Sequence, residues 1–280
     1  MKKILVPTDF SKRSQEALDF AIEFNEKYGG KIVLLHVLEI PSYHYSVAGE
    51  VNLVPIDKLY EGEFVKGTHR RLEELSKKVT EAGQEVATRL KYGNPYENIS
   101  GEITEEMADY IIMGSNGASG LREVFFGSNA ERIVRHAECP VIVVKGKASL
   151  KGMKNMVLAS DLDEEQDIIA LRAKELQEFL GVNLHLLKVT TPHNFRTKDA
   201  VDKELDAFVK RNHFENFTVN SIEADYPDDG IVAFAEKVGA GLIFIGTHGK
   251  TGLAHLFGGS RAEDLVNKSK IPVLTMKIPF

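Results

Sequence analysis

A glycine-rich string occurs twice in this 280-residue chain with the same internal spacing. The first copy reads Gly114-x2-Gly117-x9-Gly127-Ser128, and the second reads Gly246-x2-Gly249-x9-Gly259-Ser260. Residues 114–145 and 246–277 are identical at 13 of 32 positions, and each copy follows an apolar run and precedes a helix-like stretch. Isolated turns do not repeat their full spacing in this way. We therefore predict two versions of one domain, each with a phosphate-binding element.

Strand-like and helix-like segments alternate through both halves, which predicts α/β domains with a parallel sheet covered on both faces. Amphipathic stretches are expected at 14–28, 57–82, 95–107 and 128–137. The expected strands of the first half are Lys3–Pro7, Lys31–Val37, Glu85–Lys91, Ala108–Gly114 and Pro140–Lys145. Those of the second half are Met156–Ser160, Asn183–Val189, Thr218–Ala224, Gly241–Gly246 and Pro272–Lys277.

The two predicted domains span residues 1–146 and 153–280, with a small basic linker within Lys145–Lys154. Early elements of the halves correspond at an offset of 152 residues and later ones at 132. The first domain therefore carries an extra segment within 40–63. We expect a plain long loop there, with a lid or partner surface as the alternative.

The bulk composition is that of an ordinary globular protein, with 43% hydrophobic and 27% charged residues. A net charge of -6 argues against a nucleic-acid binder. The N-terminal apolar run is too short for a signal peptide, and no run approaches the ~20 residues that span a bilayer. A single cysteine, Cys139, excludes an intrachain disulfide. We expect a cytoplasmic protein in which Cys139 is a buried structural thiol, with no membrane or nucleic-acid partner.

Each glycine string starts where a buried strand ends, and its second part opens a helix. Glycines let backbone N–H groups approach an anion, and a helix start directs free N–H groups and partial positive charge outward. Ser128-x-x-Glu131 and Ser260-x-x-Glu263 read as capping boxes, a role compatible with phosphate binding. Neither string is a Walker A loop or a dinucleotide fingerprint, so another nucleotide-binding arrangement is expected.

Asp9 and Asp161 directly follow the first strand of each half. A carboxylate at this edge can accept hydrogen bonds from a ribose or an adenine amino group, and capping of the next helix is the alternative. Ligands of open α/β sheets bind where the strand order reverses. If the first and fourth strands are neighbours, Asp9 meets Gly114 and Asp161 meets Gly246.

With Pro7-Thr8-Asp9-Phe10-Ser11, Leu35-His36-Val37, Tyr92-Gly93-Asn94-Pro95 and the full glycine string, the chain resembles the universal stress protein family in tandem form, in its ATP-binding branch. The resemblance covers nearly the whole chain twice. It implies two Rossmann-like domains of the adenine nucleotide α-hydrolase type, each a five-stranded parallel sheet in the order 3-2-1-4-5. It also implies that the halves pack about a pseudo-twofold axis through their fifth strands.

By this resemblance, ATP lies across strands one and four, with any Mg²⁺ held by its phosphates. The implied nucleotide-binding residues of the first half are Asp9, Val37, Gly114, Gly117, Gly127, Ser128 and Asn129. Those of the second half are Asp161, Val189, Gly246, Gly249, Gly259, Ser260 and Arg261.

The halves depart from the family pattern in different places. The second half has Ala159 in place of Pro7, Asp225 in place of Gly93, and Gly241 in place of Asp109, but its glycine string is the fuller match. Two sites are therefore predicted without a ranking.

No catalytic set and no protein metal site stands out. His36 is expected to have a structural role rather than a role in proton transfer. His248 lies inside the second glycine string, where contact with phosphate is the alternative to a position outside the chemistry. The leading function is a nucleotide-binding stress regulator or sensor that forms homo-oligomers, such as dimers of tandem chains, and acts on an unidentified protein partner. The alternatives are a slow ATPase or adenylyl-transfer enzyme, and an assembly module with vestigial sites.

Overall fold

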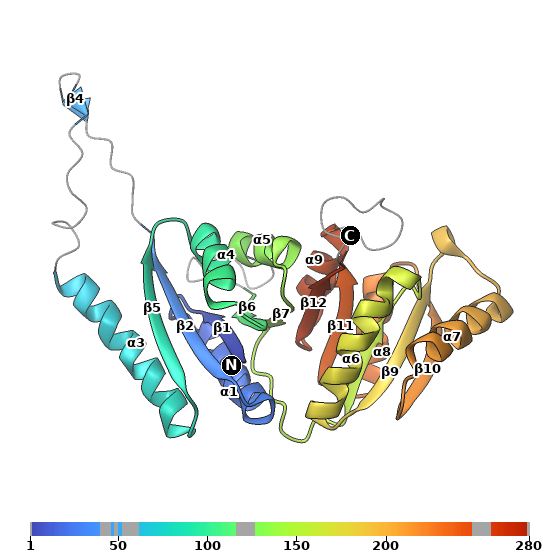
Figure 1. Ribbon diagram of the computed structural model, residues 1–280. Helices are drawn as coiled ribbons and strands as arrows, with labels where there is room; N and C mark the ends of the chain where they lie inside the picture. Colours follow the sequence, from blue (N-terminus) through green and yellow to red (C-terminus); the bar gives the residue numbers. More distant parts are fainter. Residues whose placement is uncertain are drawn as a thin grey trace.

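The computed structural model describes residues 2–39, 46–47, 50–51, 62–115, 127–247 and 259–278, and shows two α/β halves (Figure 1). The elements of the first half are β1 (Lys3–Pro7), α1 (Lys12–Tyr28), β2 (Lys31–Leu38), β3 (Ser46–Val47), β4 (Glu50–Val51), α3 (Glu63–Glu81), β5 (Val86–Tyr92), α4 (Pro95–Glu106), β6 (Tyr110–Gly114), α5 (Ser128–His136) and β7 (Val141–Val144). Those of the second half are β8 (Asn155–Ala159), α6 (Asp167–Leu180), β9 (Asn183–Thr190), α7 (Lys198–Asn212), β10 (Phe217–Glu223), α8 (Pro227–Lys237), β11 (Leu242–Thr247), α9 (Gly259–Lys268) and β12 (Val273–Lys277). Short 3-10 helices cover Glu164–Gln166 and Pro192–Asn194.

One ten-stranded sheet runs through both halves in the order β10-β9-β8-β11-β12-β7-β6-β1-β2-β5. In this sheet, the strand pairs within each half are all parallel and follow the order 3-2-1-4-5, so the predicted fold class is confirmed. Strand order therefore reverses between β1 and β6 in the first half and between β8 and β11 in the second. These are the topological switch points at which ligands of such sheets bind.

The halves join through their fifth strands, β7 and β12, which pair antiparallel. Ile142 pairs with Leu274, its own counterpart at the 132-residue offset, and the flanking pairs Val143–Val273 and Val141–Thr275 mirror each other. This register places a pseudo-twofold axis at the Ile142–Leu274 pair, as expected from the resemblance. It also covers two edges that would otherwise be open, and leaves β5 and β10 as the edges of the sheet.

Apolar side chains alternate between the two faces of the strands and build one core on each face. On one face, α1, α3, α6 and α7 pack against the sheet, and rings such as Phe24 and Phe179 meet across the halves at 5.2 Å. On the other face lie α4, α5, α8 and α9. Arg135 of α5 forms an ion pair with Glu263 of α9 across the junction.

The extra segment of the first half falls largely outside the described residues. Of it, the structure describes the antiparallel pair β3–β4 and the residue that precedes α3. The amphipathic stretch expected over 57–82 is observed as α3 from Glu63, with Gly62 as its N-cap in an extended conformation, and residues 57–61 lie outside the described residues. Loop and lid both remain predictions for this segment.

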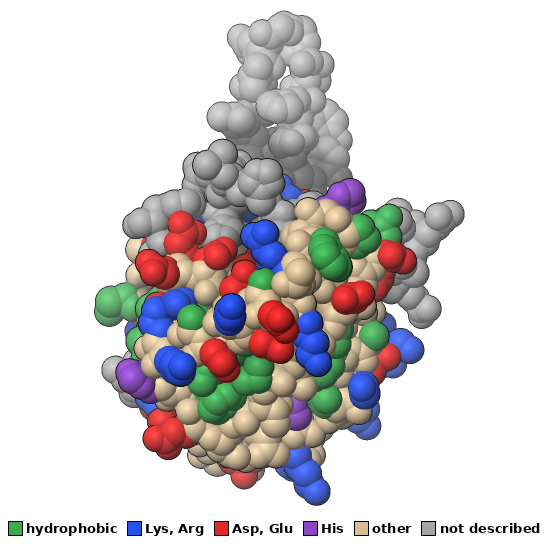
Figure 2. Space-filling view, turned by 90° about the vertical axis from the view of Figure 1, so that its right-hand side faces the viewer, with side chains coloured by type: hydrophobic (Ala, Val, Ile, Leu, Met, Phe, Trp, Pro, Cys, Tyr) green, Lys and Arg blue, Asp and Glu red, His purple; other side chains and the backbone are tan. Residues whose placement is uncertain are grey.

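At the end of the molecule formed by the second half, acidic and basic side chains are interspersed (Figure 2). This mixture matches the modest net charge and gives no extended field of one sign on that face. Within the described ranges, no helix is both long enough and apolar enough to cross a bilayer.

Candidate functional site

A cleft opens in the first half at the carboxyl ends of β1, β2 and β6, at the switch point. Its volume is about 260 Å³, near the lower end for small-molecule sites. Helices α4 and α5 form the opposite wall. The lining residues include Thr8, Asp9, Ser14, Leu35, Val37, Glu39, Ile99, Met113, Gly114, Ser115, Gly127, Ser128 and Asn129. The structure thus brings together all the predicted first-half site residues that it describes.

Asp9 offers a carboxylate oxygen to this cleft. Its Oδ1 accepts a hydrogen bond from the backbone N–H of Ser11 at 3.0 Å, which fixes the side chain in a tight turn. Its Oδ2 is buried and has no hydrogen-bond partner among the described residues. The alternative capping role is wrong, because Ser11 is the N-cap of α1 and accepts from Ser14 N–H. Asp9 therefore retains an unused acceptor in the cleft.

Ser115 gives the cleft a second unused polar group, which sequence reasoning did not single out. Its side chain is 2% exposed, and its Oγ has no partner among the described residues. The Ser115 carbonyl accepts from the Gly127 N–H at 2.8 Å and so fixes the start of α5 beside the end of β6. The free N–H groups of the first turn of α5 lie at this wall of the cleft.

The capping box expected at Ser128 does not form. Gly127 is the N-cap of α5 in an extended conformation, Ser128 is the first helical residue, and no side chain caps the helix. The exposed Ser128 and the half-buried Asn129 line the cleft instead. A helix start without a side-chain cap leaves its N–H groups available to an anion.

His36 has a structural role in the first half, as expected. Its Nδ1–H donates to the Thr8 carbonyl at 2.7 Å, and its ring lies 4.3 Å from that of Phe10. Burial lowers the pKa of His36 below its ordinary value, and the hydrogen bond to Thr8 opposes that shift in part. The ring therefore supports the backbone just before Asp9.

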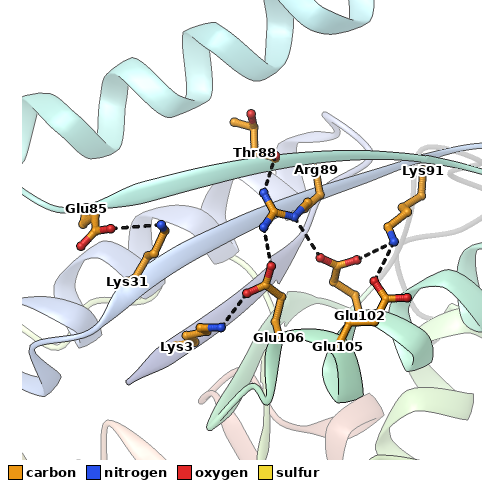
Figure 3. A network of polar contacts seen from close by, with 9 residues as sticks. All are labelled: Lys3, Lys31, Glu85, Thr88, Arg89, Lys91, Glu102, Glu105 and Glu106. Carbon is orange, nitrogen blue, oxygen red and sulfur yellow. Dashed lines mark hydrogen bonds and ion pairs between the residues drawn. The ribbon is translucent and has the colours of Figure 1, made fainter. Parts of the chain in front are cut away.

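A polar network anchors α4 to the sheet beside the cleft (Figure 3). Glu102 of α4 is 1% exposed and lies 3.3 Å from Arg89 Nε and 3.2 Å from Lys91 Nζ, both on the edge strand β5. Glu106 continues the network to Arg89 at 2.5 Å and to Lys3 of β1 at 2.8 Å. These contacts set the position of the helix that forms one wall of the cleft.

In the second half, Asp161 lies at the equivalent strand end but is already engaged. Lys188, which corresponds to His36, is 5% exposed, and its Nζ donates to the Asp161 carbonyl oxygen at 2.7 Å. The same ammonium lies 3.4 Å from Asp161 Oδ1. Because lysine is longer than histidine, it reaches one residue further along the backbone, to the carboxylate itself. Asp161 is not a helix cap either, since the 3-10 helix that follows starts after Asp163.

The apolar side of the second-half position is closed by α8. Gly230 of α8 corresponds to Asn98 of α4, and a Cβ built on Gly230 would lie 2.9 Å from Ala224 Cβ and 3.0 Å from Val189 Cγ1. Val189 is accordingly 6% exposed, whereas its counterpart Val37 is half-buried and lines the first cleft. Helix α8 therefore approaches Val189 closely at Gly230, the position where α4 carries Asn98.

The comparisons with known proteins agree on one family. The profile described as Universal stress protein family matches residues 1–145 and again residues 152–277. The chain belongs to the universal stress protein family.

Relatives of one and of two domains match this universal stress protein. Universal stress protein MJ0577 of Methanocaldococcus jannaschii is 31% identical over 157 residues, 53% of this chain and 97% of that protein. Universal stress protein E of Salmonella typhi is 26% identical over 301 residues, 99% of this chain and 94% of that protein. A crystal structure of a universal stress protein from Archaeoglobus fulgidus has the same fold, with a TM-score of 0.78 at 23% identity, covering 99% of this chain and 98% of that one.

Part of the glycine string of this universal stress protein lies outside the described residues. Gly117 with Asn116 and Ala118 falls in 116–126, and Gly249 with His248 and Lys250 falls in 248–258. Gly246 is the penultimate residue of β11, and a Cβ there would lie 2.7 Å from Gln166 Oε1. Gly259, Ser260 and Arg261 open α9, and their side chains are not described.

Sequence reasoning missed the residues that make the halves unequal. Lys188 and Gln166 replace His36 and Ser14, and Gly230 replaces Asn98. The only signal for them in the sequence was that each second-half residue differs from its first-half counterpart.

Within the described ranges, the structure shows neither a cluster of metal-binding side chains nor a reactive thiol. No group of three or more His, Cys, Asp or Glu side chains converges there in a way that could hold a metal ion. Cys139 is half-buried, and burial raises its pKa to about 12, which keeps it protonated.

Proposed function

We propose that this universal stress protein binds an adenine nucleotide, ATP, in the cleft of its first half, and that occupancy sets the conformation a partner reads in a stress response. The observation that carries the proposal is the buried, unpartnered Asp9 Oδ2 at the switch point, with the unpartnered Ser115 Oγ beside it. Thr247, the counterpart of Ser115, also has an unpartnered Oγ1, so Asp9 is the group that distinguishes the first half. An unpaired buried polar atom is costly, so a ligand that supplies a donor is stabilised there.

The division of the cleft matches the parts of a nucleotide. Asp9 and Val37 lie at the nucleoside end, where a carboxylate accepts from hydroxyl or amino groups and an apolar side chain covers a base. Gly127, Ser128 and Asn129 lie at the start of α5, where free N–H groups and the helix dipole favour phosphate oxygens. Any Mg²⁺ would be held by those phosphates and water, since the described side chains present no metal cluster.

Calorimetric titration of the full chain with ATP tests the proposal, with ADP, AMP and adenosine as comparison ligands. We expect wild-type binding to be weakened about 10- to 100-fold by Asp9→Ala, the loss of a charge-assisted hydrogen bond. Glu85→Ala, an exposed change outside the cleft, serves as the matched control. No ATP binding by the wild type, or equal binding by Asp9→Ala, would contradict the proposal.

Assays on the same preparation distinguish nucleotide binding alone from the alternative of a slow ATPase or adenylyl-transfer enzyme. Phosphate or pyrophosphate release that co-purifies with the chain and disappears in Asp9→Ala would favour it. The assembly-module alternative predicts a defined oligomer that binds no nucleotide.

A further inference from the structure

We propose that the second half of this chain takes no adenine nucleotide, because the buried Lys188 ammonium already contacts Asp161, the counterpart of Asp9, and that the chain therefore carries one nucleotide, in its first half. This inference rests on the proposed function of the first cleft.

The two equivalent carboxylates differ in their partners. Asp9 keeps a buried oxygen without a partner, whereas the equivalent Asp161 has the Lys188 ammonium at 3.4 Å from its Oδ1 and at 2.7 Å from its carbonyl oxygen. Both partners of this pair are nearly buried, with side-chain exposures of 6% and 9%. A ligand hydroxyl that replaced Lys188 at this carboxylate would break a buried charge-assisted contact, whereas Asp9 Oδ2 has no partner to displace.

The space beside Val189 is smaller than the space beside its counterpart Val37. In the first half, Asn98 turns its side chain back to the carbonyls of Tyr92 and Asn94, at 3.1 and 2.9 Å, and α4 leaves Val37 accessible to the cleft. In the second half Gly230 has no side chain, and α8 rests on Val189 and Ala224. The apolar wall available to a base in the first half is thus buried by the protein in the second.

Helix α8 is held in place by apolar packing against the sheet and by ionic contacts with α9. Glu102 of α4, with its ionic partners on β5, corresponds to Phe234 of α8, which is 7% exposed and packs in the apolar core. Lys268 of α9 adds contacts to Asp228 at 2.5 Å and Asp229 at 2.6 Å. These carboxylates raise the pKa of Lys268 above its ordinary value, so the clamp between α8 and α9 is charged at neutral pH. The closed arrangement is therefore supported on both sides of α8.

The lysine itself can be transferred to test the account. His36→Lys places an ammonium where Lys188 lies in the other half, within reach of Asp9, and His36→Met gives similar length without charge. Calorimetric titration with ATP should give one equivalent per chain for the wild type and for His36→Met. It should give a loss of at least 10-fold in affinity for His36→Lys. Asp9→Asn should weaken the single site, and Asp161→Asn should leave it unchanged.

The outcomes separate the inference from the proposed function. Two equivalents in the wild type, or one equivalent that is lost in Asp161→Asn and kept in Asp9→Asn, overturns the inference and leaves nucleotide binding standing. Equal loss in His36→Lys and His36→Met overturns the role of the charge. Absence of binding by the wild type removes the proposed function and the inference with it. Circular dichroism and the unfolding midpoint of each variant verify that the fold is intact.

Discussion

The two halves of this chain share a strand order and a switch point but differ in what fills the switch point. In the first half the carboxylate of Asp9 faces a cleft with an unused oxygen, and in the second half the carboxylate of Asp161 faces a buried lysine. Helix α4 is held by a partly exposed ionic network, whereas α8 is held by Phe234 and by direct backbone contact at Gly230. The same fold therefore has a cleft at one switch point and a buried lysine–aspartate contact at the other.

The turn that leads into each helix shows the same contrast. Gly93 has a φ of +110°, a region that other residues rarely adopt, and its N–H donates to the Leu38 carbonyl at 2.8 Å. Asn94 then caps α4 through a side-chain contact with the Glu97 N–H. In the second half Asp225 replaces the glycine without a positive φ, and Tyr226 precedes α8 without capping it. The path into α8 therefore differs from the path into α4.

The largest expected effect comes from the buried lysine. Lys188→Met should lower the free energy of unfolding by about 3 kcal/mol, because it leaves Asp161 buried beside an apolar side chain. His36→Leu, at the equivalent position, should cost about 1 kcal/mol, the value of one neutral hydrogen bond. Urea denaturation of both variants gives the comparison. A cost below about 1 kcal/mol for Lys188→Met would mean that the pair does not hold the second half closed.

A second prediction concerns the helix contact at Gly230. In an exposed helix interior, glycine to alanine normally stabilises by about 0.5–1 kcal/mol. Here the added methyl would meet Ala224 and Val189, so we expect Gly230→Ala to destabilise by about 1–2 kcal/mol. Gly101→Ala in α4, where the nearest atom is the tip of Glu105 at 4.0 Å, should stabilise instead. Thermal unfolding of the two variants should show shifts of opposite sign.

A third prediction separates the ways in which the two helices are anchored. Glu102→Gln should cost about 1 kcal/mol, and high salt should reduce that cost, because Arg89 and Lys91 remain 41% and 33% exposed. Its counterpart Phe234→Leu should cost a similar amount through lost packing, independent of salt. Unfolding measured at low and high ionic strength distinguishes the two. Equal salt dependence in both variants would contradict the contrast.

The smallest expected effect lies at the junction between α5 and α9. Burial raises the pKa of Glu263, and this outweighs the opposing effect of Arg135. A carboxylate whose folded-state pKa is raised contributes stability at low pH that is lost as pH rises through that value. Glu263→Gln should therefore stabilise the protein at neutral pH by up to about 0.5 kcal/mol. Arg135→Gln, which leaves Glu131 and Glu263 without their shared partner, should do the opposite in the same pH series.

Much of the fold followed from periodicity. The alternating segments predicted all five strands of each parallel sheet within one or two residues, and the duplicated string located the helix starts at 128 and 259. The pairing of Ile142 with Leu274 was reachable only through resemblance, since nothing in the two apolar strands distinguishes a covered edge from an exposed one.

The sequence predicted where the candidate site lies, but not that the cleft is open in the first half and packed with side chains in the second. Asp9 and Gly127 followed from strand ends and helix starts, which are local features. Closure of the second half depends on a lysine on β9 that reaches Asp161 beyond β8, and on a helix that approaches because one residue lacks a side chain. Such contacts join segments far apart in the chain. Ser115 was missed for a related reason, because its burial without a partner is a property of the packed structure.

The central claim is that one half is open to a nucleotide and the other is filled by its own side chains. A crystal structure of the full chain grown with a non-hydrolysable ATP analogue tests it most directly. We predict one analogue per chain, with its nucleoside beside Asp9 and Val37, its phosphates at the start of α5, and the Lys188–Asp161 contact intact. An analogue bound beside Asp161, with Lys188 displaced, would contradict the account.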